Sequence, residues 1–216
     1  QDYSSQVELM ELANVSKHII SPADNKSIIG IFQDSLLSTY RFTRQNQNFN
    51  KRNAMNLLMN SFKINFDIFK KEKITSFDLL TQIMPKISCK FGNGAYDGKI
   101  KNEDGEMVED ELNLIEIING EIKSGQFDKK VLGATSKGLI QTIYNDFGYK
   151  KTVDFINNLQ NIVTDYMKLT SYSVGISDLI ANTDTNDKIS QKLGNTKYQW
   201  WYITLPRTQV LNKCTV

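Results

Sequence analysis

The sequence predicts an α+β fold in which a small β-sheet or barrel is flanked by helices. Two observations support this prediction. Apolar residues recur at helical spacing in residues 5–61 and 135–172, whereas residues 86–124 alternate or are β-branched and are interrupted by glycines. The 216 residues, 40% of them hydrophobic, are sufficient to bury a core. We therefore expect a globular unit with helices at both ends and strands in the centre.

Three helices are expected in the N-terminal part. Ser5–Lys17 begins with a serine followed by Glu8 at the spacing of a capping box, and the Ser-Pro pair after it ends the helix. Asp34 is a suitable cap for a second helix that runs to Arg44, and a third helix covers Lys51–Ser61. The expected inward positions are Val7, Met10 and Ala13 in the first helix and Leu36, Leu37 and Tyr40 in the second.

The centre of the chain is expected to form strands. Asn119-Gly120 is a strong hairpin signal, because a type I′ turn needs positive φ at both central residues. The strands are expected at residues 86–91, 112–118 and 121–124. Helices then return over residues 135–147 and 152–172, and the second of them has an inward apolar stripe. The stripe consists of Ile156, Leu159, Ile162, Val163, Tyr166 and Met167.

Composition excludes several classes of protein. The formal net charge is only +2, which lacks the basic excess of a free-standing nucleic-acid binder. A single histidine, His18, and two cysteines, Cys89 and Cys214, cannot supply a self-contained zinc centre. The cysteines fit free thiols in a reducing compartment. No run of 18 apolar residues occurs, so we expect no membrane span and no membrane partner.

Charge is uneven along the chain. Basic residues exceed acidic ones by six over residues 40–73, and acidic residues exceed basic ones by seven over residues 97–121. Both stretches fit solvated surface, and both also fit contacts with phosphates or a partner subunit. The acidic stretch includes Glu103, Asp104, Glu106, Glu109 and Asp110, which leaves an unrelated hydrolase as a weaker alternative. From composition and spacing no catalytic site and no metal site emerges.

An ordered pattern carries more information than any single residue. It begins as Ile20-Ser-Pro-Ala-Asp-Asn-Lys-Ser-Ile-Ile-Gly-Ile-Phe-Gln-Asp-Ser-Leu-Leu. Val131-Leu132-Gly133, Gly138-Leu139-Ile140 and Tyr172-Ser-Val-Gly175-Ile176-Ser-Asp178 follow it. In this order, the series resembles landmarks of the largest subunit of multisubunit DNA-directed RNA polymerases. The resemblance covers about residues 5–181.

The resemblance implies a fragment of that subunit, and the composition is typical of an AT-rich genome, such as that of a large DNA virus or of an AT-rich eukaryote. Residues 1–181 would be the pore domain, which forms the wall of the pore through which nucleotides reach the active centre during DNA-templated transcription. Residues 182–216 would be a divergent or truncated tail, with no helical period from Leu193 onward. The implied activity is nucleotidyl transfer. Its Mg²⁺ would be held in the full enzyme by aspartates upstream of Gln1, so the isolated fragment would bind none and be inactive.

The resemblance also implies partners and a location. The partners would be the other polymerase subunits and the rest of the largest subunit, with DNA template, RNA and nucleoside triphosphates (NTPs) bound through the full complex. The location would be intracellular, in the nucleus or cytoplasm of a host or in a virion.

Four residues are candidates for supporting the active centre: Asn25, Lys26, Gln33 and Asp34. Lys26 would present positive potential to triphosphates, and Gln33 and Asp34 would cap and orient the loop before them. Three serines depart from the family pattern, since Ser27 replaces a usual proline and Ser38 and Ser177 replace glycines. The alternative function is a non-enzymatic binding or assembly module that retains the pore-domain fold.

Overall fold

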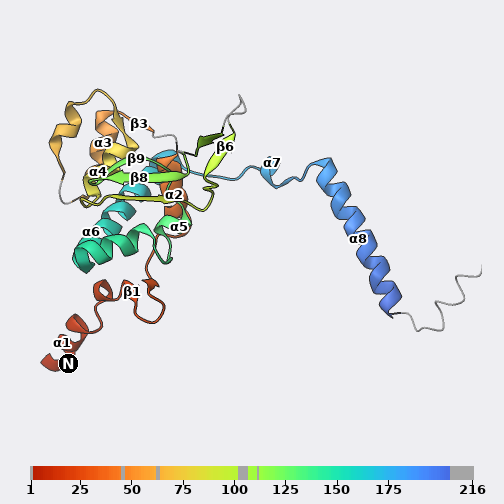
Figure 1. Ribbon diagram of the computed structural model, residues 1–216, viewed down its shortest axis with the longest axis horizontal. Coiled ribbons are helices and arrows are strands. Elements are labelled where there is room, and N and C mark those ends of the chain that lie inside the picture. Colours follow the sequence, from red (N-terminus) through yellow and green to blue (C-terminus); the bar gives the residue numbers. More distant parts are fainter. Residues whose placement is uncertain (1, 45–46, 62–63, 102–106, 111, 205–216) are drawn as a thin grey trace, which may run out of the picture. The chain divides into compact units, whose positions relative to one another are not determined.

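The computed structural model confirms the α+β class (Figure 1). It describes residues 2–44, 47–61, 64–101, 107–110 and 112–204. The chain divides into two compact units, residues 1–171 and residues 172–216.

The first unit begins with α1 (Tyr3–Glu11), a short 3-10 turn η1 (Val15–Lys17) and a hairpin of β1 (Ile20–Ser21) and β2 (Lys26–Ser27). The prediction of a single helix that reaches Lys17 is therefore wrong, because α1 ends at Glu11. Its expected inward residues Val7 and Met10 are 58% and 67% exposed, because no part of the described chain packs on this face. Ser5 does not cap the helix, since the N-cap position is Asp2.

Helices α2 to α4 follow. Leu36 on α2 packs against the core as predicted, but Tyr40 is 37% exposed, so its predicted inward position is wrong. The fully buried residues of α2 are polar apart from Phe42. Helix α4 begins with a capping box between Thr75 and Asp78. The elements of this region are α2 (Gln33–Thr43), β3 (Asn48–Phe49), α3 (Lys51–Leu58), η2 (Phe66–Lys70), β4 (Ile74–Thr75) and α4 (Ser76–Ile83), with β3 and β4 paired antiparallel.

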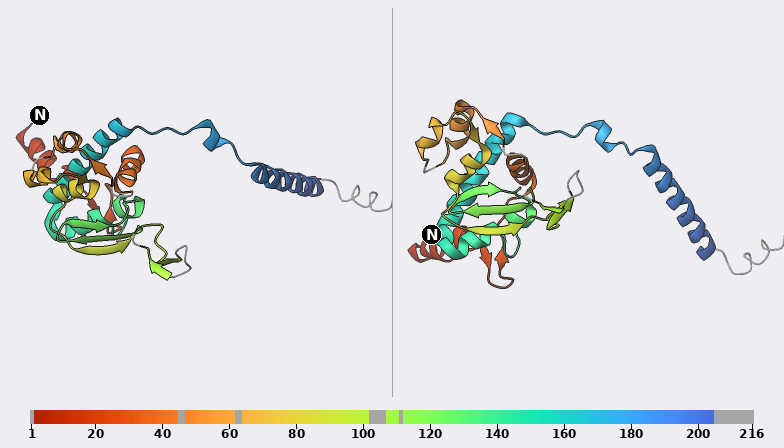
Figure 2. Two further views of the ribbon diagram at one scale, coloured as in Figure 1. Left: turned by 90° about the horizontal axis from the view of Figure 1, so that it is seen from above. Right: turned by 45° about the horizontal axis from the view of Figure 1, so that its top comes forward.

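The centre forms an antiparallel three-stranded sheet in the order β5-β8-β9 (Figure 2). The Asn119-Gly120 hairpin joins β8 to β9 as predicted, with φ angles of 50° and 85°. A separate two-stranded pair, β6 and β7, lies between β5 and β8 in the sequence. The strands are β5 (Cys89–Gly92), β6 (Lys99–Lys101), β7 (Met107–Glu109), β8 (Leu114–Ile118) and β9 (Glu121–Ser124).

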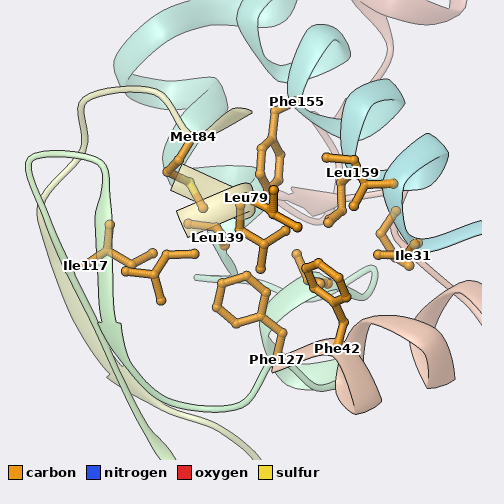
Figure 3. Packing of buried hydrophobic residues seen from close by; sticks show 14 of the residues in the cluster. Ile31, Phe42, Leu79, Met84, Ile117, Phe127, Leu139, Phe155 and Leu159 are labelled. Atoms are coloured by element: carbon orange, nitrogen blue, oxygen red, sulfur yellow. The ribbon is translucent and has the colours of Figure 1, made fainter. Parts of the chain in front are cut away.

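The core of the first unit lies where α2, α4 and α6 meet the sheet (Figure 3). After α5 (Lys129–Leu132), α6 (Leu139–Thr170) is one element with a break at Gly148, whose φ is 76°. This break confirms the prediction of two helical segments. Phe42, Leu79, Phe127, Leu139 and Phe155, each at most 1% exposed, point toward one another in the core.

The second unit contains α7 (Ile176–Leu179) and α8 (Thr183–Thr204). The prediction that residues from Leu193 onward have no helix is wrong as far as Thr204, and Pro206 lies outside the described residues. Amphipathic periodicity missed α8 because the side chains described in it are almost all exposed, so no buried face imposes a period. Within the described residues, no helix is both long and apolar enough to cross a membrane.

Candidate functional site

The candidate residues Asn25 and Lys26 lie at the tip of the β1–β2 hairpin. Asn25 has a φ of 47°, a left-handed conformation that asparagine tolerates better than most residues. Lys26 begins β2, and its ammonium lies 3.4 Å from the carboxylate of Asp24. Both side chains are about half exposed, at 47% and 59%. The tip therefore presents an exposed ion pair in which the two charges largely cancel.

The segment after the tip is held against residues 131–135. The Ser27 hydroxyl lies 3.2 Å from the carbonyl oxygen of Gly133 and 3.3 Å from that of Thr135. The amide of Ile31 donates to the carbonyl of Leu132 at 2.8 Å. We call these contacts the backbone clamp. Two stretches singled out in the sequence, residues 20–37 and 131–133, thus contact each other in the fold.

Gly30 is the point of closest approach in the backbone clamp. A Cβ atom at Gly30 would lie 2.7 Å from the carbonyl carbon of Gly133 and 2.8 Å from the amide nitrogen of Ala134. These are backbone atoms, which cannot move aside as the end of a flexible side chain can. The clamp therefore requires glycine at position 30 for lack of space.

A second anchor reaches the tip itself. The Gln141 side chain, from the first turn of α6, donates from Nε2 to the carbonyl oxygen of Asn25 at 2.9 Å and lies 3.3 Å from Asn25 Oδ1. Its Oε1 accepts from the amide of Lys137 at 2.6 Å. Gln141 is only 7% exposed. Sequence reasoning missed this residue, because 116 positions separate it from Asn25 and no local pattern marks the contact.

The other two candidates, Gln33 and Asp34, lie at the start of α2. Gln33 has a φ of 50°, and the N-cap residue is Phe32, with no side-chain hydrogen bond at the cap. The predicted capping role of Asp34 is therefore wrong. Asp34 instead lines a hollow of about 390 Å³ between α2 and the second half of α6. The other residues around it are Ser35, Gln160, Val163, Thr164, Met167 and Lys168.

The four candidates do not form one cluster. Asn25 is joined to the start of α6 by Gln141, whereas Asp34 faces the part of α6 beyond Gly148. Within the described ranges, no hydrogen bond or ion pair joins the hairpin tip to the start of α2. Their roles in supporting the active centre stay predictions, and the geometry singles out the hairpin tip as the better-anchored half.

The three serines singled out in the sequence, Ser27, Ser38 and Ser177, fit their surroundings in the structure. Ser27 and Ser38 are fully buried, and the Ser38 hydroxyl donates to the carbonyl of Val163 on α6. Ser177 lies within the short helix α7, where the backbone needs no positive φ. The hydroxyls of the two buried serines thus bond to carbonyl groups of other segments.

Histidine, cysteine and aspartate side chains, which carry out catalysis in many enzymes, have structural roles in this fold. His18 Nε2 lies 2.5 Å from the carbonyl oxygen of Leu12. Burial, with a smaller contribution from the charge of Asp146, raises the pKa of the Cys89 thiol to about 11, which disfavours the nucleophilic thiolate. Asp110, expected in a solvated loop, is instead 2% exposed and accepts from the side-chain amide of Asn113 at 2.7 Å. Residues 102–106, which include Glu103, Asp104 and Glu106, lie outside the described residues.

The resemblance implies Mg²⁺ only in the full enzyme, held by aspartates outside this chain. In the described part of the chain, no three His, Cys, Asp or Glu side chains lie close enough together to hold a metal ion. Divalent cations of this kind need several oxygen ligands around one point.

Comparison with known proteins identifies the family. Residues 18–179, about three quarters of the chain, match the family "RNA polymerase Rpb1, domain 3". The chain therefore belongs to this family and corresponds to a segment of the RNA polymerase largest subunit. The predicted resemblance is confirmed.

Individual relatives agree with the family match. The chain is 28% identical to DNA-directed RNA polymerase subunit 1 of Acanthamoeba polyphaga mimivirus over 190 residues, which are 88% of this chain and 12% of the relative. It is 25% identical to the RNA polymerase II subunits RPB1-B and RPB1-A of Trypanosoma brucei brucei over 201 residues, 91% of this chain and 11% of each relative. The chain thus spans about an eighth of the length of these curated relatives.

Proposed function

We propose that this segment forms the wall of the pore through which nucleotides reach the active centre of a DNA-directed RNA polymerase. The observation that carries the proposal is the accessible Asp24–Lys26 pair on a hairpin whose turn is anchored to the body of the fold by Gln141 and whose second strand is held by Ser27. A tip held in one position can present its charge without losing conformational freedom when a ligand arrives. The match to the polymerase family supports a nucleotide as that ligand.

The chemistry of the wall is electrostatic. Lys26 attracts the triphosphate of an approaching nucleotide, and the nearby Asp24 limits that attraction so that the nucleotide is passed on. Nucleotidyl transfer itself takes place elsewhere in the full enzyme, where Mg²⁺ polarises the phosphates when bound. The partners are the remainder of the largest subunit and the other polymerase subunits, with DNA, RNA and NTPs bound by the whole complex.

The test uses the polymerase assembled with the full-length largest subunit. Lys26→Gln removes the charge and keeps the length of the side chain. We expect the KM for NTPs to rise about three- to fivefold in template-dependent elongation with kcat unchanged, since one partly exposed charge contributes about 1 kcal/mol or less. The effect should shrink as salt is raised, because salt screens exposed charges.

A matched control is available in the same chain. Lys70 on η2 also pairs with an aspartate, Asp67, at 2.6 Å, and both side chains are exposed. Lys70→Gln should leave the KM for NTPs unchanged. If Lys26→Gln and Lys70→Gln give the same kinetics across the salt series, the hairpin tip does not contact nucleotides and the proposal is wrong.

A further inference from the structure

We propose that Gln141 is a positioning residue that fixes the hairpin tip and thereby places Lys26 at the wall of the pore. The inference rests on the proposed function and deepens it. It rests on the buried side chain of Gln141, which makes hydrogen bonds to two turns that are far apart in the sequence. One turn contains Asn25 and the other contains Lys137.

Both turns contain a residue in the left-handed region. The φ angle is 47° at Asn25 and 62° at Lys137. Residues other than glycine are disfavoured there, asparagine less than most, and contacts from the surrounding structure help to hold such a conformation. Gln141 supplies such contacts on both sides, since its Nε2 donates to the carbonyl of Asn25 and its Oε1 accepts from the amide of Lys137.

The tip has few other connections. Within the described residues, turn residues 22–25 make one further hydrogen bond, from the amide of Asp24 to the hydroxyl of Ser21, and that bond stays inside the hairpin. The backbone clamp holds the chain at Ser27 and Ile31, beyond the tip. Gln141 therefore makes the hydrogen bonds that join the turn to the body of the fold. Because Lys26 follows Asn25 directly, the orientation of the Asn25 peptide sets the direction from which the Lys26 side chain departs.

The two ends of the Gln141 amide can be separated by substitution. Gln141→Leu removes both hydrogen bonds at similar volume. Gln141→Glu keeps an acceptor for the amide of Lys137 but replaces the donor with an oxygen that faces the two oxygens of Asn25. Thr142→Val is the control, because the Thr142 hydroxyl bonds only to the carbonyl of Gly138 in its own helix.

The first measurement is hydrogen exchange on the assembled polymerase. Gln141→Leu should speed exchange about three- to tenfold both in residues 22–27 and at the amide of Lys137, as expected for the loss of one or two hydrogen bonds. Gln141→Glu should speed exchange in residues 22–27 alone. Unchanged exchange in residues 22–27 in both variants, or an equal change in Thr142→Val, would show that Gln141 does not hold the tip and would overturn the inference.

The second measurement is the KM for NTPs in the same polymerases. We expect Gln141→Leu to raise the KM with kcat unchanged, and Gln141→Leu combined with Lys26→Gln to raise it no further than Lys26→Gln alone. This non-additivity is the sign that one residue acts through the other, whereas general destabilisation would add to the effect. Independent, additive effects of the two substitutions would overturn the positioning role.

The two proposals fail in different ways. Faster exchange at the tip in Gln141→Leu, together with an unchanged KM in Lys26→Gln, supports Gln141 as the anchor of the tip and contradicts nucleotide contact there. Unchanged exchange in Gln141→Leu, together with a raised KM in Lys26→Gln, contradicts the anchor and supports nucleotide contact.

Discussion

The hydroxyl of Ser27 lies 3.2 Å from the carbonyl oxygen of Gly133, a residue 106 positions further along the chain. Ser27 is 1% exposed, so water does not compete for this hydrogen bond. The resemblance to the polymerase family implies proline at this position, and proline has no hydroxyl to donate. In this chain the hairpin is bonded to residues 131–135 by a side-chain donor that proline would lack.

We predict that Ser27→Ala lowers the free energy of unfolding by about 1–2 kcal/mol, because the carbonyl oxygens of Gly133 and Thr135 lose a buried donor. Urea denaturation of the chain, followed by circular dichroism, measures the change. Ser4→Ala is the control, since the Ser4 hydroxyl is exposed and bonds only to nearby Asp2. Equal midpoints for Ser27→Ala and the unchanged chain would contradict the role of the hydroxyl.

Local rules of sequence predicted the elements that local interactions determine. The Asn119-Gly120 turn and the strand 121–124 lie where expected, because positive φ at the turn fixes the register of the hairpin. The stripe from Ile156 to Tyr166 is confirmed because a long helix against a core needs an apolar face at helical spacing. Its last predicted member, Met167, lines the hollow beside Asp34 instead of the core. The ordered motifs predicted the family for the same reason, since each motif can be read without knowledge of its neighbours in space.

Tertiary contacts determined what the sequence did not predict. Helix α2 buries Ser38, Thr39 and Thr43 in place of the expected Leu37 and Tyr40. Its hydroxyls find partners that no local pattern shows, such as the carbonyl of Val163 for Ser38 and the amide of Phe127, which donates to Thr43. At the candidate site, Asn25 and Lys26 were predicted, but their anchor Gln141 was not, because it lies on a helix far away in the sequence.

Gly148 interrupts α6 with φ of 76° and ψ of 175°, a region that is open essentially to glycine alone. We predict that Gly148→Ala lowers the free energy of unfolding by about 1–3 kcal/mol, although the added Cβ would meet no atom within 4 Å. The loss would come from backbone strain and not from a clash. Gly194→Ala is the control: its Cβ also meets nothing, but it lies inside helix α8, where alanine favours the helix. In thermal unfolding, the midpoint temperature should fall for Gly148→Ala and should rise or stay unchanged for Gly194→Ala.

The Cys89 thiol has a pKa of about 11, raised by burial and by the charge of Asp146. The folded chain keeps the neutral thiol up to about pH 11, whereas the unfolded chain loses the proton near pH 9. The contribution of this thiol to the free energy of unfolding is therefore fully present below pH 9 and is lost as the pH rises toward 11. We predict slow alkylation by iodoacetamide at pH 8 in the folded chain and fast alkylation in urea. The experiment uses a Cys214→Ser background, which leaves one thiol, and Asp146→Asn should speed the folded reaction modestly. Equal rates in the folded and urea-denatured chain would contradict the raised pKa.

The isolated chain is expected to synthesise no RNA on a DNA template with Mg²⁺ and all four NTPs. Within the described residues it brings no three metal-binding side chains together, and its relatives are about eight times longer. Incorporation of labelled nucleotide into acid-insoluble product measures this, with the assembled polymerase as the positive control. Incorporation by the purified chain above the level of a no-protein blank would contradict the prediction and place a catalytic centre within this segment.

Asp24 should act in the opposite direction to Lys26. Its carboxylate lies 3.4 Å from the Lys26 ammonium, and the pair is exposed, so removing the acidic partner leaves Lys26 with its full positive field at almost no cost to folding. We predict that Asp24→Asn in the assembled polymerase lowers the KM for NTPs about twofold at low salt, where Lys26→Gln raises it. Asp67→Asn, which frees Lys70 in the same way on η2, is the matched control and should leave the KM unchanged. A higher KM in Asp24→Asn would mean that the carboxylate itself assists the nucleotide, which would exclude simple attraction by Lys26 as the function of this tip.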